Sequence, residues 1–417
     1  MKQRKKGAII WRVLACFLLL LLLAGLVFAR FGGFSAGESA DPQALAACAG
    51  QVEDILIPEQ AVIVALGEAT HGNREFQQLK LEVFKHLVEN YGVRALALEG
   101  DFGGCEQANR YIHGGAGTAE QAAAAIGFAI YRTEEMAGLL AYMRQYNESA
   151  APGEDLRFYG FDMQRCVYNV QFLAEACREL GVDVGQLEEL VNDDGWNTDY
   201  DVTARAELIT QVRTRLQALE GAEQALHFAD LLLQNCQLQT VEPLAYGDLR
   251  DSFMAENTLW IAERERQLGR DRLFVSGHNG HVAKYGSMES MGKLLTDRLG
   301  EGYYAIGTDF YKSKCNMPRG KEGRRTRQVF YSHDPLAVAA KRAGLDQCWL
   351  DFSLAEQNPQ LAGWINDYVY MGSLGEGYSP LMRLLPPSYR TFQPPAQLYD
   401  GMIFVTAATP TQIVEAE

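Results

Sequence analysis

One stretch of the chain, from Val62 to Glu99, constrains the fold more than any other. It begins with the short β-branched run Val62–Leu66, continues through Gly67-Glu-Ala-Thr-His-Gly72 into a helical segment, and ends with a second apolar run that leads into Glu99. Short apolar runs of this kind are typical of parallel strands that are buried on both faces. In open α/β sheets, ligands bind beyond the carboxyl ends of such strands. The sequence therefore predicts that Glu68, His71 and Glu99 lie at the ligand-binding edge of a sheet.

The same alternation of apolar strands and amphipathic helices continues along the chain. Further strands are expected at 156–162, 272–276, 303–309 and 402–405, and from about 170 to 268 nearly every window has helical periodicity. The pattern predicts an α/β fold, namely a mainly parallel sheet flanked by helices, as one domain over 51–417 with a helical insertion at about 170–268. We expect this insertion and residues 368–392 to form the walls of the substrate cleft.

The overall charge and the cysteines exclude several classes of protein. The formal net charge is -15, so we expect no binding to nucleic acid. The eight cysteines are scattered and no Cys-x-x-Cys is present, which argues against a zinc knuckle or a thioredoxin-type motif. A small-molecule substrate is the expected partner.

The N-terminus resembles a membrane anchor. A basic cluster over residues 2–6 precedes the apolar run Val13–Ala29, which contains six consecutive leucines. Residues 1–30 are therefore predicted to be a cytoplasmic basic tail and a single transmembrane helix, and residues 31–50 a linker. This interpretation places the rest of the chain outside the cytoplasm, with the membrane as a partner. A cleavable signal peptide is the alternative, because small residues follow at 35–40.

Ionisable side chains gather where the predicted strands end. Glu68 with His71, Glu99, Asp162, and the pair His278 and His281 all fall at such positions. Taken singly, each has a structural explanation, such as a loop-holding histidine or a helix-capping carboxylate. Together they suit activation of a water molecule, because an imidazole takes a proton from water and a neighbouring carboxylate fixes its tautomer.

Sequence motifs also bear on two other chemistries, serine hydrolysis and metal-dependent hydrolysis. The sequence contains no Gly-x-Ser-x-Gly, so a serine hydrolase is not supported, and no His-Glu-x-x-His. No cofactor is expected. A divalent metal at His71, Glu99, His278 and His281 nevertheless stays open as an alternative, because histidine and carboxylate side chains are suitable ligands.

These motifs, in this order, resemble the erythromycin esterase family. The resemblance extends from about Asp54 to Thr406. The matching segments are Gly67-Glu-Ala-Thr-His-Gly72, Asn109-Arg-Tyr-Ile-His-Gly114, Arg132-Thr-Glu-Glu135, Gly160-Phe-Asp-Met-Gln164, Arg250-Asp-Ser-Phe-Met-Ala-Glu-Asn257 and His278-Asn-Gly-His-Val282. The first and the last of these segments are the most specific. Members of known activity hydrolyse the lactone of macrolide antibiotics with an activated water molecule. The resemblance therefore implies an ester hydrolase.

The resemblance also implies roles for individual residues. His71 would be the general base, and Glu68, Glu99, His278 and His281 would position it, the water and the ester carbonyl. Arg250 and Lys80 are the expected substrate-binding residues, with Arg250 steadying the oxyanion. Lys80 departs from the arginine expected at its position, and an ammonium cannot replace a planar guanidinium in bidentate contact with a carboxylate.

Three functional hypotheses follow. The first is a hydrolase that cleaves a lactone or another carboxylic ester with water activated by His71, with macrolide resistance as one role. The second is a metal-dependent hydrolase or peptidase that uses the same His and Glu cluster. The third is a non-catalytic binding protein of the cell surface that keeps the family fold.

Overall fold

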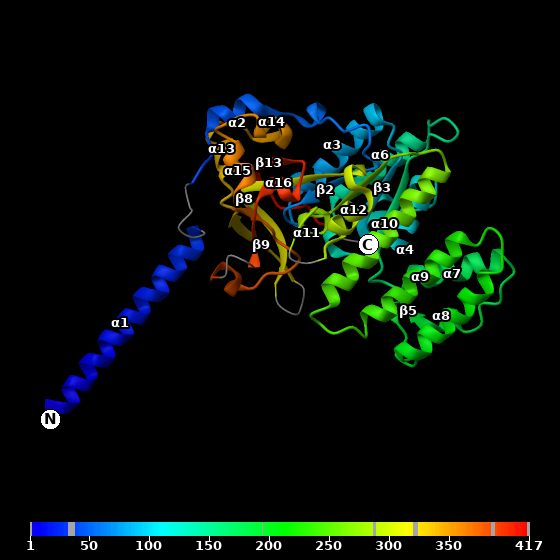
Figure 1. Cartoon of the computed structure of the whole chain (residues 1–417). Helices are drawn as coiled ribbons and strands as arrows, with labels where there is room; N and C mark the ends of the chain where they lie inside the picture. The colour runs from blue at the N-terminus through cyan, green and yellow to red at the C-terminus, as the bar shows by residue number, and fades with distance from the viewer. Residues whose placement is uncertain are drawn as a thin grey trace.

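A nine-stranded sheet forms the centre of the computed structural model, which describes residues 2–31, 38–193, 195–286, 289–319, 324–384 and 388–414 (Figure 1). Six neighbouring strands of the sheet are parallel to one another. In spatial order they are β13 (Gly401–Ala408), β8 (Tyr303–Arg319), β2 (Ile63–Glu68), β7 (Leu273–His278), β3 (Ala95–Asp101) and β4 (Arg157–Asp162). Three antiparallel strands extend it, namely β10 (Gln347–Asp351) beside β13, β1 (Ala49–Gly50) at that edge, and β9 (Arg324–Tyr331) beside β8.

The register of the parallel strands brings the predicted polar residues together. Glu68 of β2 lies opposite His278 of β7, and Leu98 of β3 lies opposite Ser276 of β7. Glu99 therefore follows a residue that is in register with Ser276, two residues before the end of β7. The prediction of a mainly parallel sheet, with these strands ending at a common edge, agrees with the structure.

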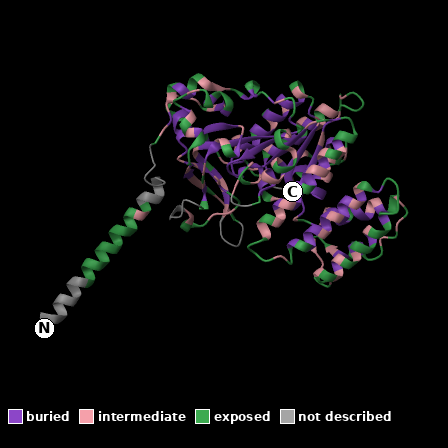
Figure 2. Cartoon of the chain, in the orientation of Figure 1, coloured by how far each residue is buried: buried purple, intermediate pink, exposed green. Residues whose placement is uncertain are grey.

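Alternate residues of the central strands pack against different helical layers. On β2, Ile63 and Ala65 belong to one buried cluster, and Val64 and Leu66 belong to another. Figure 2 shows the strands buried along most of their length. The second cluster is covered by α3 (Arg74–Tyr91), α4 (Phe102–Ile112), α5 (Ala119–Ala125) and α6 (Glu134–Asn147), and the first mainly by α10 (Tyr246–Gln267), α12 (Met291–Leu299) and α13 (Pro335–Arg342).

Helices occupy most of the segment between β4 and β7, where a helical insertion is predicted. They are α7 (Val167–Glu179), α8 (Val202–Leu216), α9 (Glu223–Leu238) and α10, with the turn η3 (Leu187–Leu190) and a two-stranded ribbon of β5 (Val191–Asn192) and β6 (Gly195–Trp196). Figure 1 shows α7, α8 and α9 grouped beside the sheet-containing body. How the chain divides into domains stays a prediction.

The remaining elements are short. β11 (Val369–Gly372) and β12 (Arg390–Gln393) form a separate antiparallel hairpin. The others are α11 (Asn279–Val282), α14 (Phe352–Glu356), α15 (Ala362–Asn366), α16 (Pro395–Leu398), η1 (Val52–Asp54), η2 (Ala129–Tyr131), η4 (Gly300–Gly302) and η5 (Pro380–Leu384).

The predicted membrane anchor is wrong. The N-terminal segment does form a helix, α1 (Lys2–Phe31), but within the described residues no helix is both long and apolar enough to cross a membrane. The apolar run Val13–Ala29 lies between Arg12 and Arg30 and falls short of the roughly 20 residues that a spanning helix needs. The transmembrane helix, the membrane as partner and the extracytoplasmic placement derived from them are therefore withdrawn.

The linker predicted for residues 31–50 is also corrected over the part that the structure describes. It contains α2 (Pro42–Cys48) and β1, which pairs with β10. The Asp41 side chain accepts a hydrogen bond from the Ala44 amide at 2.7 Å, and Pro42 occupies the first turn, so the helix has a well-formed start. Leu45 of this helix is fully buried, which explains why the segment packs instead of remaining extended. Residues 32–37 lie outside the described part.

We expect Gly72→Ala to destabilise the protein by about 1–3 kcal/mol, because overpacking forces backbone to move. A Cβ at this position would lie 2.3 Å from the main-chain oxygen of Asn316 on β8. Gly138 of α6 is the matched control, since its Cβ would meet nothing within 4 Å and alanine favours a helix by about 1 kcal/mol. Urea unfolding of both variants measures the difference. Equal stability of the two would contradict the close approach of β8 to the Gly72 turn.

Candidate active site

The carboxylate of Glu68, at the end of β2, holds the predicted base. Its Oε1 lies 2.7 Å from Nδ1 of His71, which follows β2 in the Gly67–Gly72 turn. Its Oε2 accepts hydrogen bonds from Lys80 Nζ at 2.6 Å and from Gln77 Nε2 at 2.9 Å, both on α3. Glu68 is only 1% exposed, so these bonds replace the water that a carboxylate normally binds.

The pairing shifts the protonation of both groups. Burial raises the pKa of Glu68, but Lys80 and His71 outweigh it and leave that pKa below its usual value. Burial lowers the pKa of His71, but the hydrogen bond and the charge of Glu68 outweigh it and leave that pKa above its usual value. Because Nδ1 faces Glu68, Nε2 is the ring nitrogen left for chemistry.

Lys80 does not lie where a substrate contact was predicted. It has no exposed surface, and its ammonium also donates to Gln77 Oε1 at 3.0 Å. A lysine in this position neutralises Glu68 from within the protein. We therefore assign it to the support of Glu68, and the predicted substrate contact has no geometric support.

A second group of charges surrounds Glu99 on β3, which is separated from β2 by β7. Glu99 Oε2 accepts a hydrogen bond from the His278 amide at 2.7 Å, and Oε1 accepts from Arg250 Nη2 at 2.9 Å. Arg250, on α10, also donates through Nε to Asp162 Oδ2 at 3.2 Å, and its Nη1 lies 3.1 Å from His281 Nε2. Nε and Nη2 are thus bonded to Asp162 and Glu99, so Arg250 fixes these two carboxylates, while Nη1 faces the His281 ring.

His281 lies between two carboxylates. Its Nδ1 is 2.8 Å from Asp251 Oδ1, and its Nε2 is 3.3 Å from Glu99 Oε1. Burial lowers the pKa of His281, but Glu99 and Asp251 outweigh burial and raise it to about 10. His281 is therefore a cation at neutral pH.

His278 connects the two groups. Its ring centroid lies 5.0 Å from that of His71 and 6.3 Å from that of His281. Its Nδ1 accepts a hydrogen bond from the Gly280 amide at 3.2 Å, so the proton of the neutral ring is on Nε2. Burial, with the charges of His71 and His281, lowers the pKa of His278 to about 3. The Nε2 atom is buried and has no partner among the described residues, so its N–H is an unused hydrogen-bond donor.

A divalent metal at His71, Glu99, His278 and His281 stays an untested alternative. Across the described part of the chain, no group of three or more His, Cys, Asp or Glu side chains is arranged to hold an ion. A ligating imidazole must be neutral, whereas His281 is protonated and has a guanidinium at its Nε2. We derive no step through a metal.

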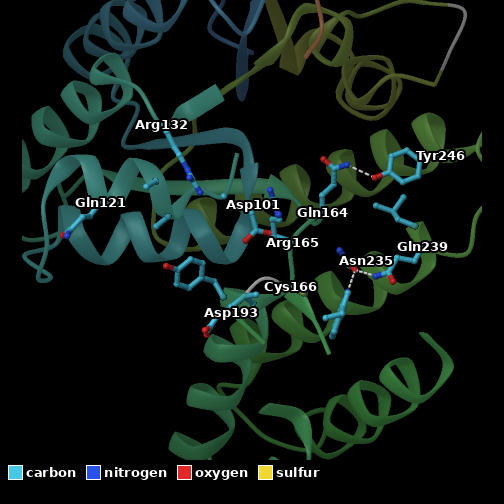
Figure 3. A pocket seen from close by; sticks show the side chains of 18 residues that line it. Asp101, Gln121, Arg132, Gln164, Arg165, Cys166, Asp193, Asn235, Gln239 and Tyr246 are labelled. Atoms are coloured by element: carbon cyan, nitrogen blue, oxygen red, sulfur yellow. Dashed lines mark hydrogen bonds between the residues drawn. The ribbon is translucent and has the colours of Figure 1, made fainter. Parts of the chain in front are cut away.

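Two cavities lie beside these groups. One of about 320 Å³ is lined by His278 and His281 and, across from them, by the β11–β12 residues Met371 and Thr391. The larger, of about 780 Å³, lies beyond the ends of β3 and β4 and includes Asp101 and Gln164, each two residues past a member of the Glu99 group. Figure 3 shows side chains from the ends of β3 and β4 and from the helical segment around it, with Gln164 bonded to Tyr246 and Asn235 bonded to Gln239.

Sequence reasoning overlooked two members of this site. Asp251 stands directly after Arg250, and it holds both His281 and the amide of Met291, the latter at 2.8 Å. Gln77 lies one helical turn before Lys80, on the side of α3 that faces Glu68. The signal for Gln77 was its helical spacing from Lys80, and the signal for Asp251 was its place next to Arg250. The predicted residues Glu68, His71, Glu99, His278, His281 and Arg250 are brought together at the sheet edge.

We expect Lys80→Met to destabilise the protein by about 3–5 kcal/mol, because it leaves the Glu68 charge buried without its cation. The matched control is Lys85→Met on the same helix, whose ammonium lies 4.6 Å from the Tyr142 ring centroid and whose loss costs about 1 kcal/mol at most. Urea unfolding at several pH values measures both. The loss of unfolding free energy in Lys80→Met should become smaller as the pH falls towards 4.5, where Glu68 becomes protonated in the unfolded chain too. Equal effects of the two variants would contradict the proposed support of Glu68.

The chain is similar in sequence and in fold to several known proteins. The family described as Erythromycin esterase matches residues 88–408. An Escherichia coli protein named Erythromycin esterase type II is 24% identical over 298 residues, covering 60% of this chain and 69% of that protein. Putative hydrolase YbfO of Bacillus subtilis (strain 168) is 23% identical over 402 residues, covering 85% of each. A crystal structure of a Bacillus cereus protein has the same fold, with a TM-score of 0.72, 20% identity, and coverage of 90% of this chain and 95% of that chain. Because the family match spans well over half of the sequence, this chain belongs to the erythromycin esterase family.

Proposed function

We propose that this chain is a carboxylic ester hydrolase in which Nε2 of His71 takes a proton from the attacking water. The observation that carries the proposal is the 2.7 Å contact between His71 Nδ1 and Glu68 Oε1. A proton held on Nδ1 leaves a lone pair on Nε2, which is the arrangement that a general base requires. The elevated pKa of His71, caused by Glu68 against the effect of burial, strengthens that base.

The reaction then needs two proton transfers. As water attacks the ester carbon, His71 accepts a proton and Glu68 stabilises the imidazolium that forms. As the tetrahedral intermediate collapses, His71 returns the proton to the departing alkoxide, and the products are a carboxylic acid and an alcohol. Lys80 and Gln77 keep the Glu68 carboxylate in place through both transfers.

His278 is the proposed donor to the carbonyl oxygen. It is neutral because burial and the neighbouring imidazoles lower its pKa to about 3, and its Nε2 carries a proton without a partner among the described residues. A donor with no bond to give up can stabilise the oxygen as negative charge develops on it. Arg250 and His281 hold Glu99, which in turn holds the His278 amide, and so they act as positioning residues.

The substrate is proposed only as a class. A relative named Erythromycin esterase type II makes the lactone of a macrolide one candidate, with antibiotic resistance as its consequence. Membership of the family supports hydrolysis in general and not one particular substrate. A simple carboxylic ester is therefore the other candidate. The metal-dependent alternative has no supporting geometry, and a site with this number of paired proton-transfer groups gives no support to a non-catalytic binding protein.

We expect His71→Asn to abolish ester hydrolysis while the midpoint of thermal unfolding changes little, because asparagine keeps a hydrogen bond to Glu68 but cannot accept a proton. The full chain is incubated with 14- and 16-membered macrolides and with aryl esters, and products are detected by mass spectrometry as a gain of one water. His113→Asn, at a histidine that contacts Asp155 away from the site, is the control and should hydrolyse normally. Full activity of His71→Asn would contradict its role as the base. Hydrolysis of aryl esters alone would retain the chemistry and reject the macrolide.

A further inference from the structure

A third cavity, of about 460 Å³, lies apart from the residues assigned to hydrolysis. It is bounded by α15, by one face of the β11–β12 hairpin and by residues that precede α13. None of Glu68, His71, Glu99, His278 or His281 lines it. The hairpin therefore separates this cavity from the 320 Å³ cavity beside His278.

Strand alternation explains why the two faces of the hairpin differ. Met371 and Thr391 pair across the strands and line the cavity beside His278. Tyr370 and Phe392 also pair, and with Tyr368 they point to the opposite face and line the 460 Å³ cavity.

The face that the cavity presents is aromatic and accessible. The Phe392 ring centroid lies 5.5 Å from that of Tyr368 and 4.7 Å from that of Tyr370. Tyr368 is 58% exposed and Phe392 is 50% exposed, and Trp364 of α15 adds a further ring to the lining. Large aromatic side chains that are left this accessible in a concave site are typical of ligand binding.

The charge of the same cavity is negative. Glu38 and Asp367 line it, and neither forms an ion pair with any residue in the described ranges. His333 also lines it, but burial, together with Arg390, lowers the pKa of His333 to about 4, so this ring adds no positive charge at neutral pH. Arg390 itself is buried behind Tyr370 and Tyr389 and is not part of the lining.

We propose that this cavity is a binding site for an organic cation, namely a quaternary or tertiary ammonium group. The face of an aromatic ring attracts a cation through its quadrupole, and a trimethylammonium group also offers apolar surface to those rings. The two carboxylates supply a complementary charge that a neutral ligand would not use. The site is independent of the proposed hydrolysis, since it shares no residue with it.

The test is isothermal titration calorimetry of the full chain with choline and with 3,3-dimethyl-1-butanol, which has the same shape without the charge. Choline is expected to bind at least about tenfold more tightly than the alcohol, because only choline gains the ring and carboxylate interactions. Equal binding of the two probes, or no heat with choline at tens of millimolar, would overturn the proposal.

Variants locate the binding. Phe392→Leu and Tyr368→Leu keep apolar surface but remove ring faces, and each is expected to weaken choline binding about threefold or more. Asp367→Asn should also weaken it, whereas Asp271→Asn, an exposed carboxylate outside the cavity, should not. These positions are exposed, so folding is expected to survive. Unchanged binding in all three cavity variants would overturn the assignment to this site, and His71→Asn should bind choline normally.

Discussion

Glu68 has almost no contact with solvent, and its two oxygens are divided between an imidazole and an ammonium. A buried carboxylate without such partners would take up a proton or destabilise the fold. Lys80 keeps it ionised, and an ionised Glu68 in turn fixes the tautomer of His71. The basicity of His71 thus depends on a lysine that is fully buried on α3 and cannot reach a substrate.

The other half of the site depends on the parallel sheet. Because β2, β7, β3 and β4 are neighbours and end at one edge, Glu68, His278, Glu99 and Asp162 meet there without any contribution from long loops. Arg250 from α10 then joins Asp162 and Glu99, which neutralises two adjacent buried carboxylates. His278 stays neutral between a base on one side and a cationic histidine on the other. The aromatic face of the β11–β12 hairpin lies outside this network, and its chemistry can be studied separately.

The sequence was sufficient to predict the six parallel strands and the polar residues at their ends, but not the antiparallel strands β1, β9 and β10 or the β11–β12 hairpin. Apolar runs such as Val62–Leu66 identify buried strands, and the topology of parallel sheets brings their carboxyl ends together. The burial of Lys80 was not predicted, although its spacing of four residues from both Phe76 and Phe84 places it on the buried face of α3, because a lysine is buried only with a partner such as Glu68. Asp251 and Gln77 were missed for a related reason, since their roles arise from pairing between elements. At the N-terminus, composition led to a membrane anchor that the described helix does not support, and to a linker in which Leu45 is in fact packed.

The most direct test of this account is the tautomer of His71, read from ¹⁵N chemical shifts of the histidine rings, with His71 assigned by its absence in His71→Asn. Above the pKa of His71, we expect a protonated Nδ1 and a proton-free Nε2, because Nδ1 faces Glu68. Its pKa should lie above the usual value of 6.5. A proton on Nε2 in the neutral ring, or a pKa below 6.5, would contradict the role of His71 as the base that activates water.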